Sequence, residues 1–284
     1  MKSAAFDYAK PESLAVALSA LAEYGDDAQL IAGGQTLLAT LNLRLSEPRL
    51  LIDITGINEL KGISVTGGYL RIAALVTHTE IEESDLVATH APLLQAAAPH
   101  IAHRAIRNRG TWGGSLAYGD PAAEWPACSM ALDATMIIAS ASGERRILAK
   151  DFFIDLYTTA LASDEILVAT EIPLASAQHV YSFQELARRH GDYASAGLAA
   201  VANKDGQTLK DCRFAFFSVA STPVLCPLAQ DLVNGQVLTE ALIQEARRSV
   251  QTNVETIADI TNSAQGKTHL VGVLLERALK QLMA

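Results

Sequence analysis

Residues Ile31–Leu41 read IAGGQTLLATL, and this short stretch decides which class of fold the chain can adopt. The apolar run that leads into it is typical of a buried strand, and the residues from Thr36 onward are typical of a helix. Gly33 and Gly34 stand between the two. A strand that ends at two glycines and continues as a helix presents free backbone N–H groups, which suit an anion such as phosphate. One such pair is also the ordinary sequence of a tight turn, so the rest of the chain must decide.

Length, charge and cysteine content narrow the class of protein. The chain has 284 residues, half of them hydrophobic, which is enough for a sizeable core and two domains. The net charge of −9 argues against general nucleic-acid binding. No apolar run reaches the length of about 18 residues that a membrane span needs, and the N-terminus lacks a signal-peptide core, so we expect a cytoplasmic protein. The distant Cys128, Cys212 and Cys226 form no metal or iron–sulfur ligand set, and we expect buried thiols.

Periodicity divides the chain into an α/β part followed by a part in which strands precede helices. We expect a hairpin at Gly67–Gly68, a helix capping box from Thr77 to Glu80, and a strand at Ile166–Pro173. Three strands and then two amphipathic helices follow. We place the boundary near Ala175–Gln178, which predicts a first domain over 1–177, with subdomains of about 1–56 and 57–177, and a second over 178–284. The first part begins as helix, strand, helix and strand, in Lys10–Gly25, Ala28–Ala32, Thr36–Leu45 and Arg49–Ile54.

A second glycine-rich segment supports the phosphate interpretation. Residues Arg107–Ala127 read RNRGTWGGSLAYGDPAAEWPA, in which Gly113 and Gly114 stand beside the hydroxyls of Thr111 and Ser115. Two glycine turns on separate segments can hold a pyrophosphate between them. On spacing alone, two ordinary tight turns explain the pattern at least as well. Neither segment is GxGxxG or GxxxxGK[ST], so a Rossmann NAD site and a P-loop are not indicated.

Other polar clusters have plainer explanations. His100, His103, Arg104 and Arg107 fall at helical spacing, with Arg109 beyond them, and form a local positive patch on an acidic chain. This basic run suits a phosphate or an acidic partner, and a solvated helix face is an equal alternative. The pair Glu82–Glu83 is typical of surface charge, and Ala187–Ala194 is typical of a hairpin corner. No catalytic triad, zinc-protease motif or catalytic cysteine arrangement is present, so we expect no catalytic residue and no metal ligand in this chain.

The two glycine segments together carry a resemblance to a known family. The sequences AGGQTLLATLNLR (Ala32–Arg44) and IRNRGTWGGSLAYGDPAAEWPA (Ile106–Ala127) strongly resemble the FAD-binding subunit of molybdenum hydroxylases, of the carbon monoxide dehydrogenase medium-subunit and xanthine dehydrogenase type. The resemblance extends over nearly the whole chain. It implies an α+β fold: a two-subdomain FAD-binding domain of the vanillyl-alcohol oxidase (PCMH) type, followed by an α+β C-terminal domain with a three-stranded antiparallel sheet and helices. Further matching stretches are LLIDITGINELKGI, EILVATEIP, ARRHGDYASAG, ASTPVL, DITNSA and HLVGVLLERAL.

The resemblance also implies where FAD lies. The flavin would sit between the subdomains with its pyrophosphate on both glycine segments. The positions that match cofactor contacts near the isoalloxazine ring are Ile101, Leu167 and Tyr193. Those that match the first glycine segment are Ala32, Gly33, Gly34, Gln35, Thr36 and Leu37. Those that match the second are Thr111, Trp112, Gly113, Gly114 and Ser115.

Three positions depart from the family pattern. Trp112 stands where Ile or Leu is usual, Glu124 replaces an Asp on the flavin side of the cofactor, and Gly266 replaces a Tyr. Glu124 is kept as a candidate cofactor contact because its longer side chain can still reach. No cysteine-rich insert of the kind that holds an extra iron–sulfur cluster in some members is present.

The function that the resemblance implies is electron transfer within a complex. A large partner subunit would hold the molybdenum cofactor, a small partner would hold two [2Fe–2S] clusters, and the assembly would be a dimer of heterotrimers. Electrons would pass through the clusters to FAD in this chain and on to an external acceptor, which the sequence does not identify among NAD, a quinone, a cytochrome or oxygen. The substrate also stays open. The alternatives are a self-sufficient flavin oxidoreductase of the same fold and a non-catalytic scaffold with vestigial glycine turns.

Overall fold

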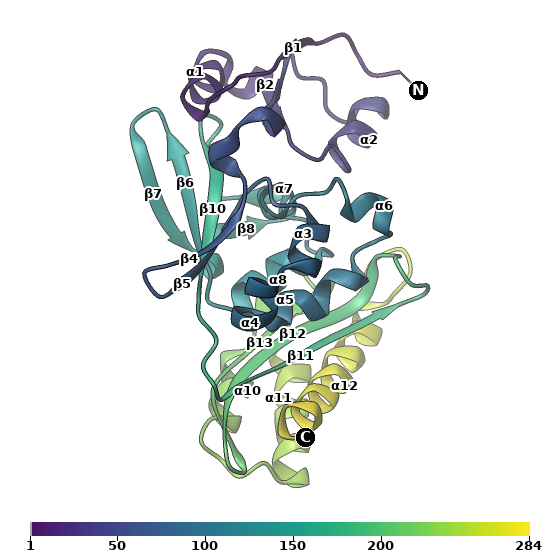
Figure 1. Ribbon diagram of the computed structural model, residues 1–284. Helices are drawn as coiled ribbons and strands as arrows, with labels where there is room; N and C mark the ends of the chain where they lie inside the picture. Colours follow the sequence, from purple (N-terminus) through teal and green to yellow (C-terminus); the bar gives the residue numbers. More distant parts are fainter. Residues whose placement is uncertain (1) are drawn as a thin grey trace.

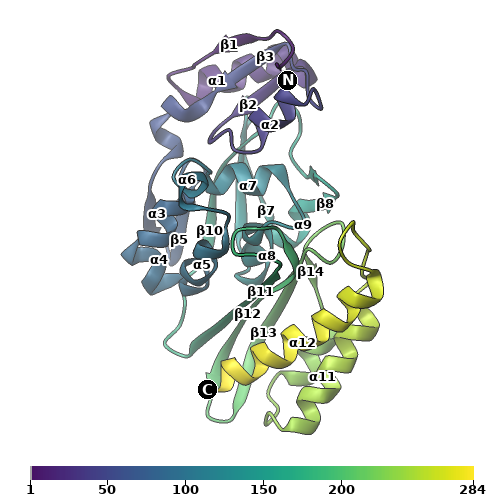
Figure 2. The ribbon, with the colours of Figure 1, turned by 90° about the vertical axis from the view of Figure 1, so that its right-hand side faces the viewer.

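Strands and helices of the computed structural model, which describes residues 2–284, are arranged as three regions from one end of the molecule to the other (Figure 1). The chain begins at one end and finishes at the opposite end (Figures 1 and 2). The strands are β1 Asp7–Ala9, β2 Ala28–Ile31, β3 Leu50–Asp53, β4 Ile63–Thr66, β5 Tyr69–Ala73, β6 Thr135–Ser140, β7 Gly143–Leu148, β8 Phe153–Asp155, β9 Thr158–Thr159, β10 Ile166–Pro173, β11 His179–Ala187, β12 Ala194–Asp205, β13 Thr208–Phe217 and β14 Val224–Leu225. The α-helices are α1 Leu14–Tyr24, α2 Leu37–Asn42, α3 His78–Glu83, α4 Asp85–His90, α5 Pro92–Ala97, α6 Arg104–Arg107, α7 Trp112–Tyr118, α8 Glu124–Ala131, α9 Ala149–Phe152, α10 Pro227–Val233, α11 Glu240–Asn253 and α12 Ala264–Met283. Short 3-10 turns are η1 Gly25–Asp27, η2 Ile54–Gly56, η3 Asn58–Leu60 and η4 Ala98–His100.

The first region is a small parallel sheet in the order β1-β3-β2. Helix α1 begins where the Ser13 side chain accepts a hydrogen bond from the backbone N–H of Val16, and it ends at Gly25, whose φ is +53°. The predicted helix–strand–helix–strand succession is confirmed. The sequence pattern did not reveal β1, because a three-residue strand is too short to show a period.

The second region is an antiparallel sheet in the order β4-β5-β10-β6-β7. The predicted hairpin is confirmed: β4 and β5 pair from Ile63 with Ile72 to Thr66 with Tyr69. The strand predicted at Ile166–Pro173 is β10, and it lies in the centre of the sheet between β5 and β6. The capping box at the start of α3 is also present, with Thr77 and Glu80 each bonded to the other's backbone N–H.

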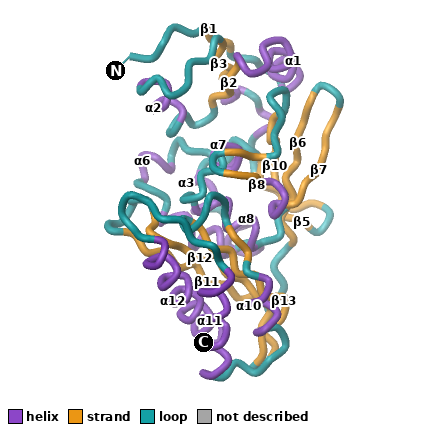
Figure 3. Tube along the Cα trace, turned by 180° about the vertical axis from the view of Figure 1, so that it is seen from behind, coloured by secondary structure: helices purple, strands orange, loops and turns teal. Residues whose placement is uncertain are grey.

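The third region is an antiparallel sheet with helices on both faces. The three predicted strands are β11, β12 and β13, and the two-residue β14 extends the sheet by pairing with Ala215 and Phe216. Helices α11 and α12 run along one face (Figure 3), while α5 and α8 of the preceding region pack on the other. Within residues 2–284, none of the helices combines the length and apolarity that a membrane crossing requires.

Strand β12 explains why the third region is tied to the second. Its apolar residues alternate between two cores: Ala199 and Val201 join the core of the second region, while Leu198 and Ala200 join the core under α11 and α12. Both faces of the strand are therefore buried, which accounts for its nearly continuous apolar sequence. One face of this sheet thus forms part of the wall of the central region, where the candidate site lies.

Candidate cofactor site

The structure brings the two glycine segments into direct contact. A Cβ atom placed on Gly33 would stand 2.7 Å from the carbonyl carbon of Arg109 and 2.9 Å from Cα of Gly110. A Cβ on Gly114 would lie 3.9 Å from the methyl carbon of Ala32. The contact between the two segments therefore requires glycine at position 33, whether or not a ligand is bound.

The first segment has the geometry of an anion-binding loop. The backbone N–H groups of five consecutive residues, 33–37, have no hydrogen-bond partner within residues 2–284. Gly34 has a φ of +71°, which turns successive N–H groups toward a common side. The hydroxyl of Thr36 does not cap α2, so it is also free to donate. Gln35 instead bonds the loop itself, because its Nε2 donates to the carbonyl of Gly33 at 3.0 Å.

The second segment differs from the prediction in one respect. Gly113 and Gly114 do not form a turn but lie in the first turn of α7. The N–H groups of Trp112 and Gly113 donate to the carbonyls of Val76 and Ala74, and that of Gly114 donates to Oγ1 of its capping residue Thr111. These N–H groups are therefore not available to a phosphate.

What the second segment still offers is hydroxyl groups and an open backbone. Thr111 keeps its own hydroxyl proton, and the hydroxyl of Ser115 has no partner within residues 2–284. Gly114 is exposed, and a Cβ there would crowd only the Thr111 hydroxyl. Gly113 is buried, with its missing side chain directed at Cα of Ala74, 2.7 Å from the Cβ position. The two glycines therefore have different roles: Gly113 allows packing on β5, and Gly114 leaves the surface beside Ala32 open.

Trp112, the first departure from the family pattern, is a core residue. It is fully buried, its Nε1 donates to Oγ1 of Thr170 at 2.9 Å, and its ring packs edge-on against Trp125. Trp125 in turn donates to Nδ1 of the buried His78 at 2.9 Å. Burial, followed by the charge of Arg107, lowers the pKa of His78 to about 3, so this imidazole stays neutral and fixes the position of α8.

The four candidate residues for the ring end of the cofactor lie in the second region and at its junction with the third. Ile101 and Leu167 are buried in the same core, Leu167 at an irregularity in the pairing of β10 with β6. Glu124 is the first residue of α8, and Tyr193, which is 71% exposed, directly precedes β12. Helix α7 begins within the second glycine segment and packs against α8, on which Glu124 lies.

The basic run is not the continuous helix face that its spacing predicted. The chain is extended at Ile101 and Ala102 has a φ of +43°, so η4 and α6 are separate. Arg107 is buried: its Nε donates to Oε2 of Glu82 at 2.9 Å and its Nη1 to the carbonyl of Ile101 at 3.1 Å. The arginine thereby holds the backbone of a candidate flavin contact in place.

The pair Glu82–Glu83 is correspondingly more than surface charge. Arg104 forms ion pairs with both carboxylates, and Glu82 also pairs with Arg107. Two of the positive charges in the run are therefore compensated within the chain. Arg109 has no ion pair within residues 2–284, and its backbone contacts the Gly33 loop, so it is the free cation of the run that lies nearest the anion-binding loop.

Sequence reasoning missed Glu185, which lies on β11 where the third region meets the second. Burial raises the pKa of Glu185 to about 7. Burial and then repulsion from Glu185 raise the pKa of Glu124 to about 8. The two carboxyls, one on α8 and one on β11, thus influence each other electrostatically, and the pKa values of both are raised. Nothing local in the sequence marks Glu185, because the titratable groups near it, His100 and Glu124, lie far away along the chain.

The third departure, Gly266, lies in the first turn of α12. Its N–H donates to the Ser263 side chain that caps the helix, and a Cβ on Gly266 would approach only that hydroxyl, at 3.2 Å. Nothing in the structure explains why glycine stands there. Among residues 2–284 no cluster of three or more His, Cys, Asp or Glu side chains forms a metal site.

Comparisons with known proteins show which proteins this chain and its fold resemble. The model of the family described as "FAD binding domain in molybdopterin dehydrogenase" matches residues 4–175, and that of the "CO dehydrogenase flavoprotein C-terminal domain" matches residues 181–282. The chain is 38% identical to the nicotine 6-hydroxylase medium subunit of Paenarthrobacter nicotinovorans over 98% of both chains. It is 34% identical to caffeine dehydrogenase subunit beta of Pseudomonas sp. (strain CBB1), over 98% of this chain and 95% of that one. A solved structure of carbon monoxide dehydrogenase from Hydrogenophaga pseudoflava superposes with a TM-score of 0.97 at 35% identity, over 99% of this chain and 98% of that chain.

These matches place the protein among the FAD-binding oxidoreductases. Within that class, the chain belongs to the family of FAD-binding medium subunits of molybdenum hydroxylases, of the carbon monoxide dehydrogenase and xanthine dehydrogenase type. The α+β fold and the family expected from the sequence are both confirmed.

Proposed function

We propose that this chain binds FAD noncovalently and passes electrons from iron–sulfur clusters of a partner subunit to an external acceptor. The observation that carries the proposal is the row of five unpaired N–H groups in the first glycine loop. A pyrophosphate supplies the acceptor oxygens that this loop lacks, and Arg109 adds a positive charge close by. FAD, when bound, supplies the two-electron and one-electron redox chemistry that links the clusters to the acceptor.

The residues proposed to hold FAD fall into two groups. The pyrophosphate group has the first loop, Ala32–Leu37, on one side and Thr111–Ser115 on the other, where Thr111 and Ser115 donate through hydroxyls. Gly114 leaves room for the ligand, while Trp112 and Gly113 act by packing behind it. The ring group is Ile101, Glu124, Leu167 and Tyr193, whose arrangement is set by Arg107, by the core of the second region and by the start of β12.

The proposed partners follow from the relatives. Two of them are named as a medium subunit and a subunit beta, so they are parts of larger enzymes, and their names refer to nicotine and caffeine. Similar subunits thus serve different substrates, which supports placing substrate chemistry in a separate large subunit with the molybdenum cofactor. A small subunit with [2Fe–2S] clusters would complete a heterotrimer, two of which would form the cytoplasmic complex.

The test is purification of the full chain, alone and with its partners. We expect the visible absorbance of oxidised flavin, and release of that flavin into the supernatant on acid precipitation, because no covalent attachment is proposed. A self-sufficient flavoenzyme would reduce its flavin with an organic substrate in the absence of partners. A colourless chain that takes up no FAD would refute the proposal and favour a scaffold.

A further inference from the structure

A buried carboxyl group lies where β11 meets the second region, and one of its oxygens has no hydrogen bond. The side chain of Glu185 is 3% exposed, and its Oε2 has no hydrogen-bond partner. His100 forms an ion-pair contact with it, in which Nδ1 lies 3.6 Å from Oε2, beyond hydrogen-bond distance. An ionised carboxyl in this position would be costly, so the group must either carry a proton or receive a hydrogen bond from something else.

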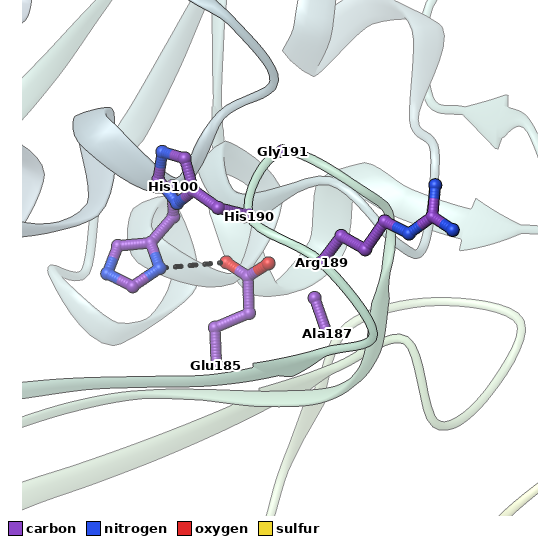
Figure 4. Close-up of a pocket in the computed structure, with 6 residues that line it drawn as sticks. All are labelled: His100, Glu185, Ala187, Arg189, His190 and Gly191. Carbon is purple, nitrogen blue, oxygen red and sulfur yellow. Dashed lines mark ion pairs between the residues drawn. The ribbon is translucent and has the colours of Figure 1, made fainter.

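The carboxyl points into a pocket that leads outward. The pocket has a volume of about 200 Å³ and is lined by His100, Glu185, Ala187, Arg189, His190 and Gly191. Figure 4 shows both imidazoles on the side of the Glu185 carboxyl, while Arg189 turns its guanidinium away. A liquid water molecule occupies about 30 Å³, so the pocket has room for several waters beside the carboxyl. His100 is partly exposed and His190 is exposed, so the pocket is open to solvent.

The titratable groups near Glu185 come from three elements. His100 lies on η4; Arg189 and His190 lie on the loop after β11; Glu124 and the buried Cys128 lie on α8. The raised pKa values of the two glutamates mean that this carboxyl pair retains at least one proton at neutral pH. Burial and then the charge of His190 lower the pKa of His100, so this imidazole is neutral and able to pass a proton on.

Flavin reduction by an iron–sulfur partner creates a need for such a group. The clusters deliver electrons without protons, whereas two-electron reduction of an oxidised flavin takes up at least one proton. We infer that Glu185 gives this proton to the bound flavin and regains it from solvent through the pocket flanked by His100 and His190. The inference rests on the proposed function, because the iron–sulfur clusters are the reductant.

The electrons and protons of this step balance. Two electrons from the clusters and one proton convert oxidised flavin to its anionic reduced form, while the Glu185 carboxylic acid becomes a carboxylate. His100 then passes one proton from pocket water to that carboxylate, and the acid is restored before the next turnover. Glu124, which Glu185 influences electrostatically and which is itself a candidate cofactor contact, lies on the proposed route to the flavin.

Infrared difference spectroscopy on the FAD-loaded full chain tests the inference. Dithionite reduction at pH 6 should bleach the carbonyl band of a protonated carboxylic acid in wild type, and the bleach should shrink as the pH rises through about 7. Glu185→Gln should lack this band, whereas the control Glu245→Gln, an exposed position on α11, should keep it. His100→Gln should keep the band but slow proton uptake, followed with an indicator dye, by about 10²-fold.

The outcomes separate this inference from the proposed function. Failure to bind FAD in the first place would refute the proposed function. Normal FAD absorbance with an unchanged band in Glu185→Gln, or with a band lost only in Glu124→Gln, would overturn the assignment to Glu185 alone. The infrared spectrum of the apo-chain, recorded against pH, detects the acid without any turnover, and the backbone amide bands of the same spectrum show whether each variant is folded.

Discussion

The contact between the glycine segments predicts a large effect for a small substitution, Gly33→Ala. The added Cβ would stand 2.7 Å from the Arg109 carbonyl carbon, and still closer to its oxygen. Carbon atoms pack at about 3.5–4.0 Å, so the segments must separate by about 1 Å. Both neighbours are backbone, so no side chain can rotate away. Overpacking of this kind costs about 1–3 kcal/mol.

That cost should appear mainly as lost affinity for FAD. The loop has few bonds of its own, so in the apo-protein it can shift away from Arg109, but binding of the pyrophosphate needs the closed contact. A penalty of 1–3 kcal/mol corresponds to about a 5- to 150-fold rise in Kd. The assay is fluorescence titration of the apo-protein with FAD, accompanied by a thermal melt.

Gly56→Ala is the matched control. A Cβ on Gly56 would meet the Lys10 side chain at 3.5 Å, an ordinary contact, and Gly56 lies in the same N-terminal region. We expect its Kd for FAD to stay within about twofold of wild type. If Gly33→Ala also binds FAD within twofold and melts with wild type, the segments do not act as a joined cradle, and the reasoning from their contact is refuted.

Three further predictions concern Gly114, Arg107 and Glu185. Gly114→Val should lower FAD affinity by at least about tenfold, because its side chain would occupy the space beside Ala32, and should also lower the melting temperature, because its Cβ would stand 2.7 Å from the Thr111 hydroxyl that caps α7; equal affinity would remove this position from the site. Arg107→Met should lower the unfolding free energy of the apo-protein by about 3 kcal/mol because it removes the buried partner of Glu82 and leaves the Ile101 carbonyl without its hydrogen bond, whereas Arg104→Gln at the exposed end should cost about 1 kcal/mol or less; similar denaturation midpoints for the two variants would contradict this. The pKa of Glu185 is about 7 in the folded chain and near 4.5 in the unfolded chain, so the unfolded chain loses this proton first as the pH rises. The unfolding free energy should therefore fall by up to about 3 kcal/mol between pH 4.5 and pH 7, and Glu185→Gln should flatten that part of the pH profile. Parallel pH profiles of urea denaturation for variant and wild type would refute this prediction.

Local sequence signals accounted for much of the fold. The hairpin at Gly67–Gly68, the capping box at Thr77 and the helix that ends at Gly25 all depend on residues within a few positions of one another. The glycine segments were also visible, and their convergence agrees with the structure. In each case the residue types strongly favour the backbone conformation that the structure shows.

What the sequence did not reveal depends on partners distant along the chain. Trp112 and Gly113 read as a second phosphate turn, yet their N–H groups are taken by the strand end at Ala74–Val76. Arg107 read as part of an exposed patch, yet Glu82 and the bend at Ile101 bury it. Periodicity reports which face of an element is apolar, but it does not report which neighbour covers a polar group on that face.

The position of β12 connects these observations. Ala199 and Val201 of β12 share a core with Ile101 and Leu167. Strand β12, which Tyr193 directly precedes, is therefore fixed to the region that carries the other ring-end candidates. Glu185 becomes buried by the same packing, since β11 pairs with β12 along its whole length. The C-terminal domain is therefore not a passive addition to the first domain: by closing this face it buries the Glu185 carboxyl beside the pocket that His100 and His190 line.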